Sequence, residues 1–257
     1  HRGKGTLKML DYSFKEESRK MLNLLKYTRQ WKQSVGVAIF FYMLGVLFIT
    51  LGGFNTALGG MYMMIGGSML VQGYEQIFFT SYMNTSAKHR YYSVNMYSIF
   101  TLVTFTIGYV MAMIGIAIRE MLINREWDEH IEKVIINLNM GMKSGAVLLF
   151  VGIMGMIIVI YYGVASKLYF SSMIVFIIAF FAIYMVMVNV TTADNFNETI
   201  LAFGIRWKQL NISFGKGAVI GYLILLAGIA ISRLLRKALY DRQYSPMYKK
   251  MFLRLSK

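Results

Sequence analysis

A line of polar side chains lies in the second of several long apolar runs in this chain. Ser68, Gln72 and Glu75 are spaced four and three residues apart, which places them on one face of an α-helix. Glu75 is the only acidic residue within these runs. An ionisable group in such surroundings is costly and commonly lines the route of a substrate or ion. We therefore take this face as a candidate pathway, with one alternative: Glu75 lies near the end of its run, where it can reach an interfacial Lys or Arg.

A weaker polar stripe occupies the third apolar run, where Thr101 and Thr104 are three residues apart. These hydroxyls would extend the candidate pathway. Hydrogen bonds from threonine to carbonyls of its own helix are the simpler explanation, and we favour it.

The segment 80–95 between the second and third runs is short, polar and basic. One interpretation is a surface that couples to a partner protein, and its candidate residues are Asn84, Ser86, Lys88, His89 and Arg90. The simpler interpretation is a solvated loop that follows the positive-inside rule.

The sequence offers little for catalysis. It has no Cys and three His, which are far apart along the chain, so no metal site is expected. It contains no phosphate-binding P-loop motif, no G-x-S-x-G and no H-E-x-x-H. We expect no catalytic residues, no cofactor and no metal in this chain, which is then not an enzyme by itself.

The composition places these residues in a membrane protein. Hydrophobic residues make up 57% of the 257 residues and charged residues only 15%, against about 25% in soluble domains. We predict an all-α fold in which six helices cross the bilayer. The expected spans are 34–53, 58–79, 96–118, 145–164, 168–190 and 217–235. The net charge of +15 then reflects anionic headgroups and membrane orientation, and no nucleic-acid partner is expected.

The basic residues predict the orientation. Of the 27 Lys and Arg residues, 20 lie on the side of the two termini, which places both termini in the cytoplasm. The expected division is a cytoplasmic segment 1–33, a membrane domain 34–235 and a basic tail 236–257. Within the first segment, 20–32 is amphipathic, and Lys26, Arg29 and Lys32 would hold this interfacial helix at the membrane surface. Two outer loops, around 127–138 and 196–207, also have amphipathic periodicity.

Glycines recur every seven residues in the second span and predict close helix packing. They are Gly59, Gly60, Gly66, Gly67 and Gly73. Short identities between the two halves of the chain, such as Gly108-Tyr109 and Gly221-Tyr222, are compatible with inverted three-helix repeats in a channel. Chance is the better explanation, because apolar helices use few residue types.

The architecture resembles that of permease subunits of ABC-2 type exporters. The amphipathic stretch from Met21 to Trp31 is similar to their elbow helix, and 80–95 occupies the position of their coupling helix. The resemblance implies an exporter of amphipathic substrates (peptide, lipid or drug) in the bacterial cytoplasmic membrane. It also implies a second permease chain and a separate ATPase subunit that carries ATP and Mg. The long outer loop around 127–138 and the lack of Pro in 80–95 depart from the pattern.

A structural role is the main alternative. The scarcity of charge in the spans, the many Met and aromatic residues and a first residue other than Met suit an accessory subunit of a respiratory complex. Such a complex would place the chain in the mitochondrial inner membrane, with both termini in the matrix.

Overall fold

The computed structural model describes residues 14–51, 54–79, 83, 85–125, 140–192, 212–240, 243–246 and 248, and these are almost entirely helical, with no strand among them. The α-helices are α1 (Phe14–Tyr27), α2 (Arg29–Leu51), α3 (Phe54–Glu75), α5 (Tyr97–Arg125), α7 (Met140–Ala165), α8 (Tyr169–Thr192) and α9 (Phe214–Ala238). A short 3-10 helix, η1 (Gln76–Phe79), follows α3, and a π-helical turn, η2 (Tyr91–Met96), leads into α5.

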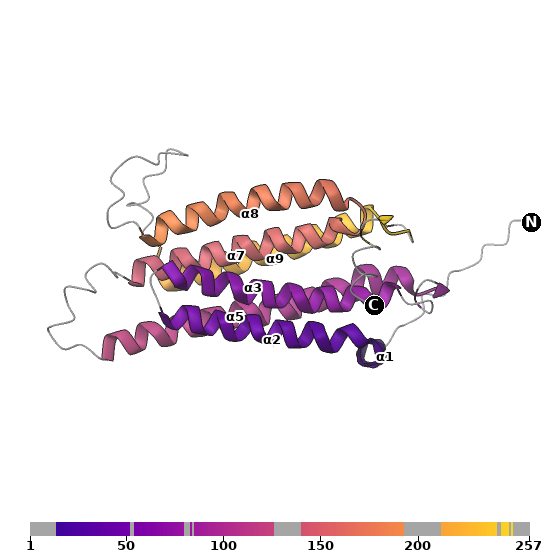
Figure 1. Ribbon diagram of the computed structural model, residues 1–257, viewed down its shortest axis with the longest axis horizontal. Coiled ribbons are helices and arrows are strands. Elements are labelled where there is room, and N and C mark those ends of the chain that lie inside the picture. Colours follow the sequence, from indigo (N-terminus) through magenta and orange to yellow (C-terminus); the bar gives the residue numbers. More distant parts are fainter. Residues whose placement is uncertain are drawn as a thin grey trace, which may run out of the picture.

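Four helices of the described chain are long and apolar enough to cross a membrane. They are Trp31–Thr50 within α2, Tyr91–Arg119 formed by η2 and α5, Ser144–Ala165 within α7, and Phe214–Ala238, which is α9. The expected spans 58–79 and 168–190 correspond to α3 and α8. The glycines and polar residues of α3 dilute its apolar character, and α8 contributes a shorter apolar stretch, Tyr169–Ile183. Both helices run alongside the other four in Figure 1.

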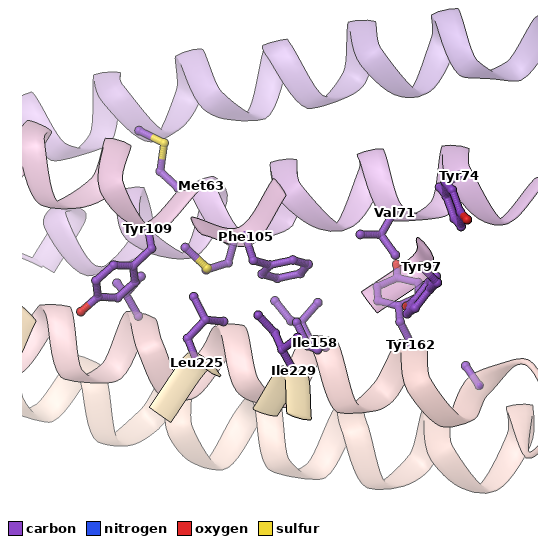
Figure 2. Close-up of a cluster of buried hydrophobic side chains, with 14 of the residues drawn as sticks. Met63, Val71, Tyr74, Tyr97, Phe105, Tyr109, Ile158, Tyr162, Leu225 and Ile229 are labelled. Atoms are coloured by element: carbon purple, nitrogen blue, oxygen red, sulfur yellow. The ribbon is translucent and has the colours of Figure 1, made fainter. Parts of the chain in front are cut away.

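The long helices form one bundle with α2 and α8 at its opposite edges (Figure 1). The helices α3, α5, α7 and α9 supply most of the buried core, which includes Phe105, Leu225 and Ile229. Figure 2 shows these side chains pointing toward one another between the helices. Large apolar side chains on α2 and α8, such as Phe40 and Val175, are instead exposed.

The expected glycine packing is present along α3. A Cβ at Gly59 would lie 2.6 Å from the carbonyl oxygen of Gly45, and one at Gly73 would lie 2.8 Å from Ser34, so this face touches α2 closely. Gly66 also faces α2, whereas Gly60 faces Val151 of α7 and Gly67 faces Phe105 of α5. The small residues therefore let α3 sit between three neighbours.

A second glycine contact, which the sequence analysis did not identify, joins α7 to α9. A Cβ at Gly152 would collide with the backbone of Gly221, and a Cβ at Gly217 would collide with that of Gly145. These two helices approach until their backbones touch. The two halves of the bundle differ in their central helix. In the first half α3 packs against both α2 and α5, and in the second half α7 packs against both α8 and α9.

The N-terminal helix is displaced toward the N-terminus relative to the predicted 20–32. It runs from Phe14 to Tyr27, and the Thr28 hydroxyl donates to the Leu25 carbonyl oxygen at the break before α2. Trp31 therefore belongs to α2 and not to the preceding amphipathic helix. Figure 1 shows α1 nearly end-on beside the start of α2, so the chain turns sharply here.

Two predicted features of the outer loops cannot be compared with the structure. The amphipathic stretches around 127–138 and 196–207 lie outside the described residues. The helix α1, the segment 85–96, the α7–α8 turn and the end of α9 lie at the same end of the bundle (Figure 1). The ion pairs of the described residues lie at this end.

Candidate functional site

A buried ion pair joins the end of α3 to the end of α9. Arg236 donates to the Glu75 carboxylate, and both side chains are almost completely buried. The two residues are far apart in the sequence, and the fold brings them together because α3 and α9 end at the same level of the bundle. From the sequence, Glu75 was expected either to line a pathway or to reach an interfacial cation. The structure pairs it with a cation, from inside the bundle.

Several groups hold the guanidinium in place. Arg236 donates to the carbonyl oxygens of Tyr162 at 2.9 Å and Ser93 at 3.3 Å. Its Cζ lies 3.2 Å from the centre of the Tyr97 ring, a cation–π contact. The pair is thus a junction of α3, η2, α5, α7 and α9. Among the described residues, neither the Glu75 oxygen Oε2 nor the Arg236 Nε has a hydrogen-bond partner.

The other candidate pathway residues are also enclosed. Ser68 donates to the carbonyl oxygen of Ile65 in its own helix at 2.7 Å, and Gln72 donates to the Tyr162 hydroxyl. Thr104 donates back to the Phe100 and Thr101 carbonyls, as the simpler interpretation expected, and the Thr101 side chain is buried. All five candidates, Ser68, Gln72, Glu75, Thr101 and Thr104, therefore lie on surfaces between helices of one chain.

A second charged cluster joins α1 to the segment before η2. Glu17 on α1 accepts hydrogen bonds from Lys88 Nζ at 2.7 Å and from the Tyr92 hydroxyl at 2.5 Å. Its neighbour Lys20 also donates, at 3.4 Å. Burial acts to raise the pKa of Glu17, but these hydrogen bonds outweigh it and lower the pKa from the ordinary 4.5 to about 2. Glu17 is therefore ionised at neutral pH, and its carboxylate holds α1 against Lys88 and Tyr92.

The residues of the predicted coupling segment have different environments. His89 is buried, within hydrogen-bond distance of the hydroxyls of Tyr240 and Tyr244. Arg90 is exposed and lies over the Tyr240 ring, with its Cζ 5.3 Å from the ring centre. Lys88 is half-buried.

The start of this segment is less fully described. Ser86 is half-buried and accepts from the backbone N–H of Lys88 at 3.2 Å, whereas Asn84 lies outside the described residues. Beyond η1, much of 85–96 is therefore packed against the chain itself. It is not a uniformly solvated loop.

The helix α1 is not a free amphipathic helix. Its apolar residues Met21 and Leu25 are buried in the main core, whereas Leu22 is half exposed. Lys26 and Lys32 are exposed, and the side chain of Arg29 lies outside the described residues. The apolar face that the sequence analysis assigned to the membrane surface thus packs largely on the bundle.

Three participants in these clusters escaped the sequence analysis. Arg236 fell in the predicted tail, but α9 continues to Ala238 and carries it into the core. Glu17 preceded the amphipathic segment that was considered. Tyr244 pairs with His89 although it lies beyond the last helix. The spacing of Arg233 and Arg236 gave no signal, because residues three apart lie on the same face of a helix.

No group of three or more potential metal-binding side chains occurs in the described part of the chain. Comparison with known proteins found no matching family model, no matching curated protein and no matching solved structure. The function is therefore argued from the architecture and the contacts described above.

Proposed function

We propose that this chain is the membrane-spanning permease subunit of an ATP-driven exporter of the ABC-2 type. In this proposal α2, α3, α5, α7, α8 and α9 all cross the bacterial cytoplasmic membrane, with both termini in the cytoplasm. A separate ATPase subunit binds ATP and Mg and supplies the energy. The substrate is amphipathic, such as a peptide, a lipid or a drug.

The packing of 85–96 is the observation that carries the proposal. This segment contacts α1 through Lys88 and Glu17, and it contacts the chain beyond α9 through His89, Tyr240 and Tyr244. It also continues directly into α5 through η2. A force applied to 85–96 would therefore move α1, α5 and the end of α9 together, as a coupling element must.

The exposed cation of this segment, Arg90, is suited to an acidic rim on an ATPase. Lys88 is half-buried and paired with Glu17, and His89 is buried and holds the backbone of the segment in place. Exposed charges contribute to partner choice and association rate, whereas a buried residue contributes to the fold. Arg90 is thus the residue to vary when docking is tested.

The transport path is best placed between two permease chains. Within one chain, Glu75 is paired with Arg236, and Gln72 is hydrogen-bonded to Tyr162. These contacts leave the candidate pathway residues engaged in helix packing. A path between two copies, or between this chain and a related one, does not require these residues to leave their partners.

Purification in mild detergent, with quantitative mass spectrometry of the associated proteins, tests this proposal. We expect one P-loop ATPase in a fixed ratio to the permease. Arg90→Glu should lose this ATPase, and Lys237→Glu, a matched exposed cation on α9, should retain it. Association with a large set of respiratory subunits would instead support the structural role of an accessory subunit. If both variants bind the ATPase equally well, the segment 85–96 is not its docking site.

A further inference from the structure

A buried cation lies at the end of the bundle opposite to the Glu75–Arg236 pair. Arg119 is the last residue of the apolar stretch formed by η2 and α5, and only 9% of it is exposed. Its Nη1 donates to the hydroxyl of Thr56, in the first turn of α3. Figure 1 shows the start of α3 at the end of the bundle away from α1. This contact is therefore separate from the segment 85–96 that the proposed coupling role requires.

Arg119 lacks the opposite charge that the other buried ions have. In the described part of the chain, the buried Asp, Glu, Lys and Arg side chains are Glu17, Glu75, Arg119 and Arg236. Glu75 pairs with Arg236, and Glu17 pairs with Lys88. None of the ion pairs among the described residues includes Arg119, and its hydrogen bond goes to a neutral hydroxyl. A buried charge without compensation is destabilising.

The start of α3 adds to the need for an anion here. The first backbone N–H groups of a helix have no acceptor within it, and the aligned peptide dipoles place a partial positive charge at this end. Thr56 brings the full charge of Arg119 to the same helix end. Two positive groups that meet where little water reaches them favour an anion between them. Phosphate and carboxylate groups are the usual ligands of helix N-termini.

The exposed face of α5 indicates the kind of anion. Its apolar side chains form a stripe at helical spacing that reaches the residue before Arg119. They are Val103, Ile107, Val110, Ile114 and Ile118, each between 36% and 51% exposed. Such a stripe is suited to an acyl chain, and Arg119 lies where the apolar stretch ends, at the level of the bilayer headgroups. An amphipathic anion uses both features, whereas a soluble anion uses only the cation.

We infer that Arg119 and the first turn of α3 bind a phosphate oxygen of an anionic phospholipid, with an acyl chain along the exposed stripe of α5. The guanidinium presents parallel N–H donors that match two phosphate oxygens, and Thr56 fixes its orientation from the other side. The small exposed part of Arg119 is the edge that the headgroup reaches. The inference goes beyond the proposed export function and does not depend on it.

Thermal unfolding of the delipidated full chain in mild detergent tests the inference. Phosphatidylglycerol, phosphatidylcholine and inorganic phosphate are added separately. We expect phosphatidylglycerol at about 100 times its Kd to raise the Tm by roughly 5–10 °C, and phosphatidylcholine to leave it nearly unchanged. Arg119→Met should weaken the Kd for phosphatidylglycerol about tenfold or more. Lys216→Met removes an exposed cation near the start of α9, at the same end of the bundle, and should bind as the wild type does.

The Tm without lipid separates ligand binding from a purely structural role of Arg119. The delipidated wild type keeps an uncompensated buried cation, so Arg119→Met should unfold at the same Tm or a higher one. If Arg119 only held α5 to α3, its loss would lower this Tm. Arg119→Lys is the second variant: it keeps the charge but not the parallel donors, and it should bind phosphatidylglycerol more weakly than the wild type.

The outcomes of these measurements are distinct. A Tm rise with inorganic phosphate alone, lost in Arg119→Met, would support the anion site but overturn its assignment to a lipid. Equal Tm rises with the two lipids, or no response to any addition, would overturn the inference. So would binding equal to that of the wild type in both Arg119 variants, or equal losses of binding in Arg119→Met and Lys216→Met.

Discussion

Replacing either member of the Glu75–Arg236 pair should destabilise the chain strongly, and replacing both should not. Arg236→Met leaves the Glu75 carboxylate buried among α3, α5, α7 and α9 without its cation. Glu75→Leu leaves the guanidinium with two carbonyl acceptors and the face of Tyr97. Both single variants retain an uncompensated charge, whereas the double variant Glu75→Leu/Arg236→Met retains none.

The burial of the pair sets the expected magnitude. Both side chains are at most 5% exposed, and breaking such a pair costs about 3–5 kcal/mol, whereas replacing it with apolar residues is often nearly neutral. At about 2–4 °C per kcal/mol for a chain of this size, each single variant should lose roughly 6–20 °C in Tm. The coupling energy between the two sites should therefore reach at least about 3 kcal/mol. Arg236→Met should be the more damaging variant, because Arg236 keeps other acceptors when Glu75 is lost.

Thermal unfolding of the purified chain, followed by circular dichroism in one detergent at neutral pH, measures these differences. Arg233→Met is the matched control: Arg233 lies one turn earlier on α9, is exposed and donates to Asn95 at 3.2 Å. It should change the stability by less than about 0.5 kcal/mol. If the two single losses simply add in the double variant, the pair is not the source of the stability and the reasoning fails.

Three other predictions use the same unfolding assay. The stabilising effect of Glu17 should be complete above pH 4.5 and be lost as the pH falls toward 2. The difference in Tm between the wild type and Glu17→Gln should therefore shrink over that range. A Tm difference that stays constant would contradict the role of Glu17 in holding α1. Gly152→Ala should lower the free energy of unfolding by about 1–3 kcal/mol because the added methyl group forces α7 and α9 apart. Gly36→Ala is the control and should not lower it, because the space around Gly36 is open. Equal effects of the two variants would refute the close packing. Tyr109→Phe should lose about 1 kcal/mol, because the Tyr109 hydroxyl donates to the Ala218 carbonyl oxygen at 2.9 Å; an unchanged Tm would show that this hydrogen bond adds nothing.

The helices themselves were largely predictable from the sequence. Apolar runs of about twenty residues have only one open-ended solution in a bilayer, and every predicted span overlaps a helix of the structure. Gly59, Gly66 and Gly73 of α3 were predictable as packing residues because their spacing of seven returns them to one face, which meets α2. The glycines of α7 and α9 were harder to recognise, because the complementary positions, such as Gly152 and Gly221, lie on different helices.

The partners of the charged groups could not be predicted from local patterns. Glu75 was recognised as unusual, but its partner Arg236 depends on where α9 ends and on which of its faces turns inward. Glu17 and Lys88 are likewise distant in the sequence, and only the fold brings α1 against the segment before η2. Hydropathy reports which segments are apolar. It does not report which polar residue each segment will meet.

The placement of these charges has a consequence for any coupling mechanism. Glu17 ties α1 to Lys88, His89 ties the same segment to the chain after α9, and Arg236 ties α9 to α3. The polar contacts form a continuous chain across one end of the bundle, whereas the rest of the core is held mainly by apolar and glycine contacts, together with separate hydrogen bonds from Tyr109 to Ala218 and from Arg119 to Thr56. Dispersion contacts are short-ranged and allow helices to slide, but a buried ion pair resists separation because each charge would be left uncompensated. The end that holds Glu17, Lys88, Glu75 and Arg236 should therefore move as one body.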